Sequence, residues 1–310
     1  MLQKPIDNPT THPLIYSYQQ SAYDRLCAIA NGFIHTDFTG LPIKPRGNVF
    51  IIGTSGSGKT HLAHAVASSL GLACLPISVA EWIVMGASQR SAPSTWPTIY
   101  QFMLQLEDEA GGIIFLDELD KIGTLKSQGE WVRYQTTEVF FLLDRKFPKN
   151  LNDLEGDRLT DEQITKAETT LKNKTLILAG GAFQDIWDSN LIGFGASESD
   201  TLPPDLNRLT QYIPAELTRR FGSQLVILPR LQETDYHNML ARILPSLPQR
   251  WRGRYKMLAR DGIPEATRLA QGPRYFEELL LEVAIHEHLS INMAASPEPT
   301  HDPAGPGITT

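Results

Sequence analysis

Short apolar runs alternate along the chain with longer stretches of helical spacing. A short apolar run that ends at glycine or charge is typical of a strand buried on both faces of a parallel sheet. Apolar residues that recur every three to four positions indicate an amphipathic helix. The runs that predict strands are Asn48–Ile52, Leu75–Ser78, Ile113–Leu116, Thr175–Ala179 and Leu225–Leu228. The stretches that predict helices are Leu14–Phe33, His61–Leu70, Ile99–Glu109, Trp131–Leu143, Glu233–Leu244 and Pro273–His288.

This alternation predicts an α/β fold, in which helices cover a parallel sheet. After Pro229 the strand signal stops and helical spacing continues alone. We therefore expect an irregular arm at 1–13, a large domain at 14–229, a smaller, mainly helical domain at 230–294 and a disordered tail at 295–310. Within the large domain, Phe147–Asn173 is polar and poorly periodic, which is typical of an insertion.

Composition narrows the class of protein. The 310 residues are 41% hydrophobic and 20% charged, which is enough for a buried core and excludes a wholly disordered chain. The net charge of −7 differs from the basic balance of a protein that coats nucleic acid. The sequence has no apolar run of about 18 residues and no signal-like start, so a cytoplasmic location is expected. Cys27 and Cys74 form no CxxC pair and are expected to be small buried residues.

A glycine-rich loop follows the first strand run directly. Residues 53–60 read GTSGSGKT, which fits the G-x-x-x-x-G-K-[ST] pattern of a phosphate-binding loop between a strand and a helix. Glycines let successive backbone N–H groups face a phosphate, and the helix N-terminus adds positive potential. Lys59 is expected to reach the β- and γ-phosphates, and Thr60 to offer its hydroxyl to Mg²⁺. The predicted nucleotide-binding residues of this segment are Thr54, Ser55, Gly56, Ser57, Gly58, Lys59, Thr60 and His61.

Two carboxylates follow the third strand run. Ligands of open α/β sheets bind at the carboxyl ends of the strands, so Asp117 and Glu118 are expected beside the phosphate loop. Asp117 is predicted to hold Mg²⁺ through water, and Glu118 to orient and polarise the attacking water. Because Glu118 favours hydrolysis over passive binding, we expect an enzyme that hydrolyses a nucleoside triphosphate with Mg²⁺.

Two other classes of phosphate-loop protein are disfavoured. A GTPase would carry Asn-Lys-x-Asp for guanine, but Asn173-Lys174 is followed by Leu176 where aspartate is required. A small-molecule kinase would not need the two carboxylates in this form, and would usually bring a basic lid over the phosphates.

Four further segments resemble motifs of the AAA+ ATPases, and within them of the ClpX and HslU type. Leu178–Phe183 resembles the sensor-1 strand, and Ile192–Ala196 resembles a loop that docks on a peptidase. Ile213–Phe221 resembles the helix that ends in an arginine finger, and Gly272–Arg274 resembles the sensor-2 turn of the small domain. Together with the nucleotide motifs, the resemblance covers roughly residues 14–290. It implies a P-loop AAA+ sheet followed by a helical C-terminal domain.

The resemblance also implies roles for residues outside the phosphate loop. It implies a ring, expected to be a homo-hexamer, with ATP at the subunit interfaces. Arg220 is then the arginine that acts on the nucleotide of a neighbouring subunit, and Arg219 competes for this role. Arg274 would contact nucleotide within its own subunit. By resemblance only, Ile15 and Tyr16 flank the adenine.

One expected partner is a ClpP-type peptidase. Ile192, Gly193 and Phe194 place two large apolar side chains on a loop rich in Gly, Ser and Asp, where an exposed apolar tip marks a docking site. The alternative is a loop that packs these side chains on its own core.

The other expected partner is a protein client that is pulled through a central pore. Val84, Met85 and Gly86 stand where the ClpX type has an aromatic pore loop. Trp82 lies close by and could supply the aromatic contact, or it could belong to a helix face in the core. No zinc-binding adaptor cysteines occur, so client choice is expected to differ from that of ClpX.

Taken together, these features predict a ring ATPase of the ClpX type that unfolds or remodels proteins, with a ClpP-type peptidase as an expected recipient of the unfolded chains. The alternative is an AAA+ ATPase that remodels a DNA-bound protein assembly, which shares every ATP residue. The basic, aromatic run Arg250–Lys256 favours that alternative. Nucleic acid is not expected as the main partner, and no membrane association is expected.

Overall fold

The computed structural model describes residues 14–38, 40–82, 95–124, 130–154, 156–183, 211 and 215–294. The strands are β1 (Asn48–Ile52), β2 (Ala73–Ser78), β3 (Gly112–Asp117), β4 (Thr175–Gly181) and β5 (Leu225–Ile227). The first helices are η1 (Ser17–Gln19), α1 (Gln20–Ile34), α2 (Lys59–Ser69), α4 (Thr95–Gln105), α5 (Lys121–Thr124), α6 (Glu130–Leu143), α7 (Asp161–Asn173) and α10 (Ala215–Phe221). The last are α11 (Glu233–Ile243), η5 (Leu244–Ser246), α12 (Gln249–Arg268) and α13 (Arg274–Ala294).

The strands form one parallel sheet in the order β2-β3-β4-β1-β5. Strand β1 therefore lies between β4 and β5, and β4 separates β1 from β3. Every residue of β1 and β4 is buried, which explains why these strands read as continuous apolar runs. The α/β fold predicted from the sequence is confirmed.

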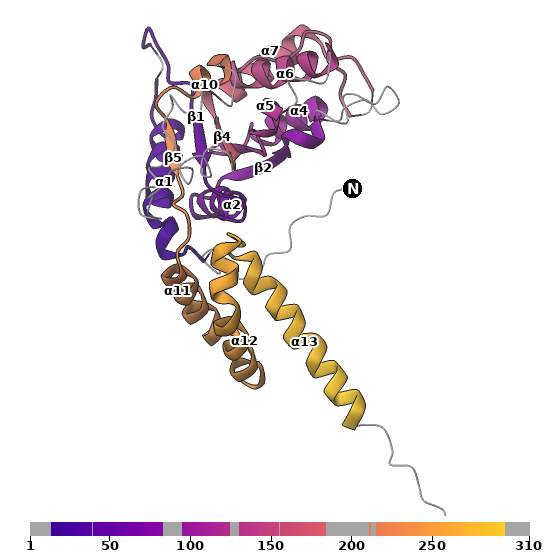
Figure 1. Cartoon of the computed structure of the whole chain (residues 1–310). Helices are drawn as coiled ribbons and strands as arrows, with labels where there is room; N and C mark the ends of the chain where they lie inside the picture. The colour runs from indigo at the N-terminus through magenta and orange to yellow at the C-terminus, as the bar shows by residue number, and fades with distance from the viewer. Residues whose placement is uncertain are drawn as a thin grey trace, which may run out of the picture.

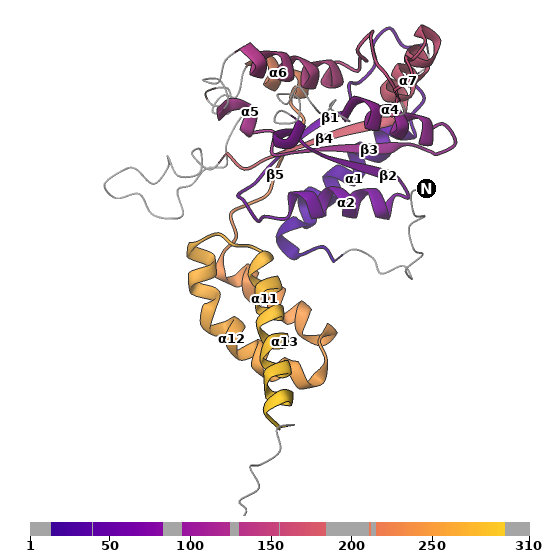
Figure 2. The same cartoon turned by 90° about the vertical axis from the view of Figure 1, so that its right-hand side faces the viewer.

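Helices cover both faces of the sheet (Figures 1 and 2). Along β1, Val49 and Ile51 belong to the apolar cluster under α1 and α2, whereas Phe50 and Ile52 belong to the cluster under α4, α6, α7 and α10. This division follows from the two-residue period of a strand, which turns successive side chains to opposite faces. The result is a three-layer domain in which the carboxyl ends of β1 and β3 lie at one edge of the sheet.

A separate helical unit follows the last strand. Helices α11, α12 and α13 bury their own apolar cluster around Tyr236, Tyr255 and Phe276, and they lie below the sheet in Figures 1 and 2. Helix α12 runs unbroken through Pro264, in a stretch that the apolar spacing does not predict as a helix. The glycines and the proline of this stretch hid the helix, because both residue types lower helix propensity. The residue limits predicted for the two domains stay predictions.

The region expected to be an insertion contributes to the core. Helix α7 begins at a capping box, in which Thr160 Oγ1 accepts from the Gln163 backbone N–H and the Gln163 side chain accepts from the Thr160 N–H. Ile164, Ala167 and Leu171 of this helix are buried against the sheet. The i, i+3, i+7 spacing of these three residues was hidden by the charged positions around them.

Trp82 belongs to the core. Its side chain is 1% exposed, and its indole N–H donates to Glu138 Oε2 at 2.8 Å. The expectation that Trp82 supplies an aromatic contact in a pore is therefore wrong, and the alternative of a core position is confirmed.

The two cysteines are half-buried rather than fully buried, and burial raises the pKa of the Cys74 thiol to about 11.

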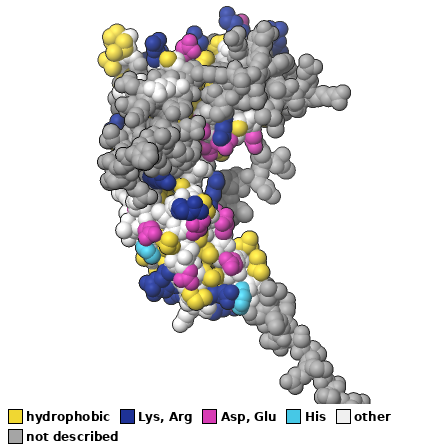
Figure 3. Space-filling view, in the orientation of Figure 1, with side chains coloured by type: hydrophobic (Ala, Val, Ile, Leu, Met, Phe, Trp, Pro, Cys, Tyr) yellow, Lys and Arg dark blue, Asp and Glu magenta, His cyan; other side chains and the backbone are white. Residues whose placement is uncertain are grey.

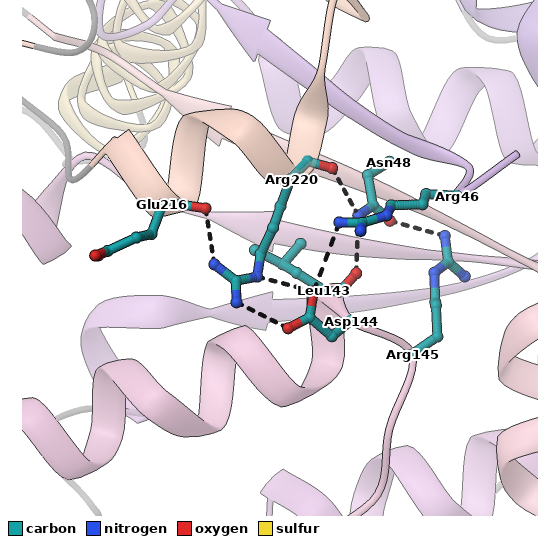
Figure 4. Close-up of polar contacts among 7 residues, drawn as sticks. All are labelled: Arg46, Asn48, Leu143, Asp144, Arg145, Glu216 and Arg220. Atoms are coloured by element: carbon teal, nitrogen blue, oxygen red, sulfur yellow. Dashed lines mark hydrogen bonds and ion pairs between the residues drawn. The ribbon is translucent and has the colours of Figure 1, made fainter.

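A buried arginine, Arg145, joins α7, β4 and β1, and Figure 4 shows its contact with Asn48 of β1. Arg145 donates to the carbonyl oxygens of Leu171, Thr175 and Gly47 and to the side chain of Asn48. No carboxylate is among the partners recorded for Arg145 in the described residues. Burial lowers the pKa of its guanidinium to about 9, so the group still carries its charge at neutral pH.

Replacing Arg145 by methionine should destabilise the fold strongly. The buried carbonyls would lose their donors, so we expect the unfolding free energy to fall by about 3 kcal/mol or more. Arg268→Met is the matched control, because its ion pair with Glu265 is exposed and should contribute little to stability. Urea unfolding followed by circular dichroism compares the two, and equal effects would contradict a structural role for Arg145.

Candidate nucleotide site

The phosphate loop joins β1 to α2 through two glycines of left-handed conformation. Gly56 has φ +76° and Gly58 has φ +81°, values that side-chain-bearing residues rarely adopt. Because Gly58 is the N-cap of α2, the helix starts at Lys59, two residues before the predicted start. Its free backbone N–H groups thus point into the loop, as a phosphate site requires.

Lys59 is held inside the loop. Its ammonium group donates to the carbonyl oxygens of Gly53 at 2.9 Å and Thr54 at 3.1 Å, and the residue is 9% exposed. Burial lowers the pKa of Lys59, while the carboxylates of Asp117 and Asp120 act in the opposite direction. The cation is therefore fixed between the loop and the acidic end of β3.

The two sequence motifs meet through one short hydrogen bond. Thr60 Oγ1 donates to Asp117 Oδ2 at 2.6 Å, although the residues are 57 positions apart. The other oxygen of Asp117 accepts from the Glu118 backbone N–H at 2.9 Å. Glu118 itself has φ +58°, an uncommon conformation for a non-glycine residue, and it lies on the turn that leaves the strand. A hydroxyl and carboxylates in this arrangement are hard oxygen ligands of the kind that Mg²⁺ takes.

These groups line a pocket of about 760 Å³ between the sheet edge and the helical unit. The predicted site residues on its wall are Tyr16, Ser55, Gly56, Gly58, Lys59, Thr60, His61, Asp117, Glu118 and Arg274. The structure thus brings together residues from four separate parts of the sequence. Thr54 and Ser57 are buried behind the loop, and Ile15 lies beside the pocket without lining it.

The N-terminal segment supports the phosphate loop from behind. Tyr18 Oη and Gln19 Nε2 both donate to the Ser57 carbonyl oxygen, at 3.1 and 3.3 Å. Tyr16 stacks on Tyr18 with ring planes 6° apart, and burial raises the pKa of both phenols. Sequence reasoning found Tyr16 but missed Gln19, because a lone glutamine at a helix start carries no motif.

The helical unit reaches the pocket through a glycine turn. Arg274 is the first residue of α13, and Glu277 lies one turn further on; both line the pocket. Before them, Gly272 has φ +64°, its N–H donates to Tyr236 Oη at 2.8 Å, and a Cβ there would overlap the backbone of Gly56. The phosphate loop and the helical unit are therefore in direct backbone contact. Glu277 was missed because one glutamate in a charged helix gives no signal.

The structure does not describe the predicted partner loop or the predicted pore loop. Ile192, Gly193 and Phe194, and also Val84, Met85 and Gly86, lie outside the described residues. Both loops stay predictions.

The residues that line this pocket fit a nucleoside triphosphate with Mg²⁺. The glycine loop offers backbone donors and Lys59 a cation for phosphate oxygens, and Thr60 and Asp117 offer oxygens for the metal ion. The fold and this site define a P-loop nucleotide-hydrolysing domain.

A match to a known protein family supports this class of domain. The model of the ATPase family associated with various cellular activities (AAA) matches residues 49–212, which is more than half of the chain. The chain therefore belongs to the AAA family of ATPases, and its enzymatic activity is ATP hydrolysis.

Curated relatives come from several branches of these ATPases. ClpX, the ATP-binding subunit of an ATP-dependent Clp protease in Bacteroides fragilis, is 29% identical over 217 residues, 64% of this chain and 49% of ClpX. The ATP-dependent zinc metalloprotease FtsH of Syntrophus aciditrophicus is 37% identical over 84 residues, 27% of this chain and 11% of FtsH. The cell division control protein 48 homolog C of Arabidopsis thaliana is 31% identical over 123 residues, which are 37% of this chain and 14% of that protein.

The chain spans about half the length of the ClpX relatives that it matches. Its membership of the AAA family is thus firmer than any likeness to one branch. Among the described helices, none has the length and apolar character needed to cross a bilayer.

Gly272→Ala should weaken ATP binding about tenfold or more. A left-handed residue with a Cβ costs about 1–2 kcal/mol, and the added atom would push the turn away from the phosphate loop. Gly253→Ala in α12 is the matched control, because nothing lies within 4 Å of its added Cβ. It should leave binding unchanged and stabilise the helix by about 1 kcal/mol. Fluorescence titration with a labelled ATP analogue measures the affinity of both variants. Unchanged affinity in Gly272→Ala would refute the idea that contact between this turn and the phosphate loop supports ATP binding.

Proposed function

We propose that this chain is the subunit of a ring-shaped ATPase, a homo-hexamer, that unfolds or remodels protein clients in the manner of ClpX. One observation carries the proposal: the nucleotide pocket is walled by both the sheet domain and the helical unit. Nucleotide in this pocket contacts both parts, so its hydrolysis changes how they are held together. Such a movement is what pulling on a client requires.

Within the pocket, each residue has a distinct task. Lys59 and the loop backbone bind the phosphates, and Thr60 and Asp117 hold Mg²⁺, which when bound neutralises charge on the phosphate oxygens. Glu118 orients the attacking water, and Arg274 contacts the nucleotide from the helical unit. By the resemblance, Ile15 and Tyr16 flank the adenine, and of these two Tyr16 lines the pocket. An arginine at the end of α10, Arg219 or Arg220, acts on the nucleotide of the neighbouring subunit.

The proposed partners rest on the resemblance. Val84, Met85 and Gly86 contact the client in the pore, and Ile192, Gly193 and Phe194 dock on a ClpP-type peptidase. The 29% identity to ClpX over 217 residues supports a client of the protein class. The curated ClpX relatives are ATP-binding subunits of an ATP-dependent protease, and we propose that assembly for this chain.

The second candidate is an ATPase that remodels a DNA-bound protein assembly. Exposed cations on α12, among them Arg252, Lys256 and Arg260, favour it. On the face drawn in Figure 3, however, acidic and basic side chains are interspersed over the helical unit, without the single-sign field that nucleic acid attracts. We therefore favour a protein client.

Turnover of ATP measured alone, with an unfolded protein, with a ClpP-type peptidase and with DNA separates the candidates. Stimulation by unfolded protein or peptidase supports the proposal. Stimulation by DNA alone, with the steep salt dependence of phosphate contacts, supports the second candidate. The absence of turnover in every arm would refute both.

Glu118→Gln should lower kcat for ATP by about 100-fold or more, because the amide cannot accept a proton from water. ATP affinity should stay within about threefold of the unaltered chain, since Lys59 and the loop are intact. Glu109→Gln is the matched control: it lies before β3, at the opposite edge of the sheet, and should be unaltered in both constants. Full turnover in Glu118→Gln would remove this residue from the catalytic site.

A further inference from the structure

Helix α13 enters the nucleotide pocket with two side chains of opposite charge. Arg274 and Glu277 both line the pocket. They are three positions apart, so they lie on one face of the helix, about 4.5 Å apart along its axis. The arginine has a ligand in the triphosphate, whereas phosphate groups would repel a carboxylate on the same wall. Glu277 would therefore need a ligand of a different kind in this pocket.

The Glu277 carboxylate is available to a ligand. Its residue is exposed, and in the part of the chain that the structure describes no hydrogen bond or ion pair is recorded for this carboxylate, Arg274 included. The next residue, Glu278, is also exposed but does not line the pocket. Of these two adjacent carboxylates, only Glu277 therefore faces the space where a nucleotide binds.

Lys59 and Arg274 mark the phosphate end of the pocket. Burial is the main cause that lowers the pKa of Lys59, and the positive charge of Arg274 acts in the same direction. The two cations are therefore within electrostatic reach of each other. One triphosphate between them would offset their repulsion. Arg274 thus lies on the side of the pocket that binds phosphate.

The N-terminal segment forms the opposite end of the pocket. Leu14 and Tyr16 line it, and the Leu14 carbonyl oxygen lies 3.0 Å from His61 Nε2 on α2. Burial raises the pKa of Tyr16, and the negative charge of Glu277 raises it further. Glu277 therefore lies near the Tyr16 phenol, about one helical turn further from the phosphate loop than Arg274.

A nucleoside triphosphate fits between these two ends in one direction. Its phosphates belong with the glycine loop and Lys59, so its sugar and base lie toward Tyr16 and Glu277. An ionised carboxylate only accepts hydrogen bonds, so its ligand must be a donor. The first donors beyond the phosphates are the 2′- and 3′-hydroxyl groups of the ribose. Acidic side chains bind ribose hydroxyls in this way in dinucleotide-binding folds.

We propose that Glu277 binds the ribose of the nucleotide through its 2′- and 3′-hydroxyl groups, and that it thereby makes the site selective for ribonucleotides. Ribose binding by Glu277 rests on the nucleotide site of the proposed function, and it adds the part of the substrate that the helical unit recognises. Arg274 then contacts phosphate and Glu277 contacts ribose, so one turn of α13 binds the nucleotide at two points.

Nucleotide binding by Glu277→Ala tests this role. Calorimetric titration with Mg²⁺, in a Glu118→Gln background that preserves the nucleotide, compares ATP with 2′,3′-dideoxy-ATP, which lacks both hydroxyl groups. The chain that keeps Glu277 should bind ATP about tenfold or more tightly than the dideoxy nucleotide, because hydrogen bonds to a charged acceptor are strong. Glu277→Ala should lose this preference through weaker binding of ATP alone. Loss of negative charge by itself would favour both nucleotides equally, so it cannot produce this result.

Glu278→Ala is the matched control, because it removes the adjacent exposed carboxylate, which does not line the pocket. It should keep the preference for ATP. Alanine favours the helical conformation, so both variants should fold, and circular dichroism checks this.

Three results would overturn ribose binding by Glu277. The first is equal binding of ATP and the dideoxy nucleotide by the chain that keeps Glu277. The second is an equal loss for both nucleotides in Glu277→Ala, which would mean that Glu277 acts through Arg274. The third is a loss for ATP that inosine triphosphate does not share, which would mean that Glu277 binds the 6-amino group of adenine.

Binding and turnover together separate this proposal from the proposed function. If the unaltered chain hydrolyses ATP while Glu277→Ala keeps the preference for ATP, ribose binding by Glu277 fails and the proposed function stands. If the chain that keeps Glu277 binds neither nucleotide, the nucleotide site of the proposed function itself fails.

Discussion

The hydrogen bond from Thr60 to Asp117 is the interaction on which the nucleotide site depends. It joins the helix after β1 to the end of β3 across β4, the strand that separates them. This bond requires the strands to be parallel and to end at the same level, so that two motifs distant in sequence meet at one edge. Beside this bond lies Gly180, the last residue but one of β4, where a Cβ would lie 2.9 Å from the Phe115 ring and 3.4 Å from Asp117. A side chain at that position would have to displace the Phe115 ring.

The sequence was sufficient for those parts of the site that depend on local structure. A strand, a glycine loop and a helix in immediate succession determine where Lys59 and Thr60 lie. The run before Asp117 determines the second motif in the same way. The parallel sheet followed from the apolar runs, since burial on both faces leaves no alternation in the pattern.

Other parts depend on pairings that no local pattern encodes. Arg220 and Asp144 are 76 positions apart, and nothing in either segment points to the other. Gln19 supports Ser57 from 38 positions away, and the Gly272 turn contacts Gly56 from another part of the fold. Helix α7 was missed for a different reason, because its three buried residues stand among many charged ones. Where tertiary contacts decide a residue's role, periodicity and motifs give no information.

Strand β1 links the phosphate loop to the contact between Arg220 and Asp144. Its carboxyl end becomes the phosphate loop, and its amino end carries Asn48, which fixes the chain on both sides of the Arg220–Asp144 contact. A strand of five residues spans about 17 Å, and this one is buried between two neighbours, so it behaves as a rigid element. The phosphate loop and the carboxyl end of α10 are therefore held by the two ends of one buried strand.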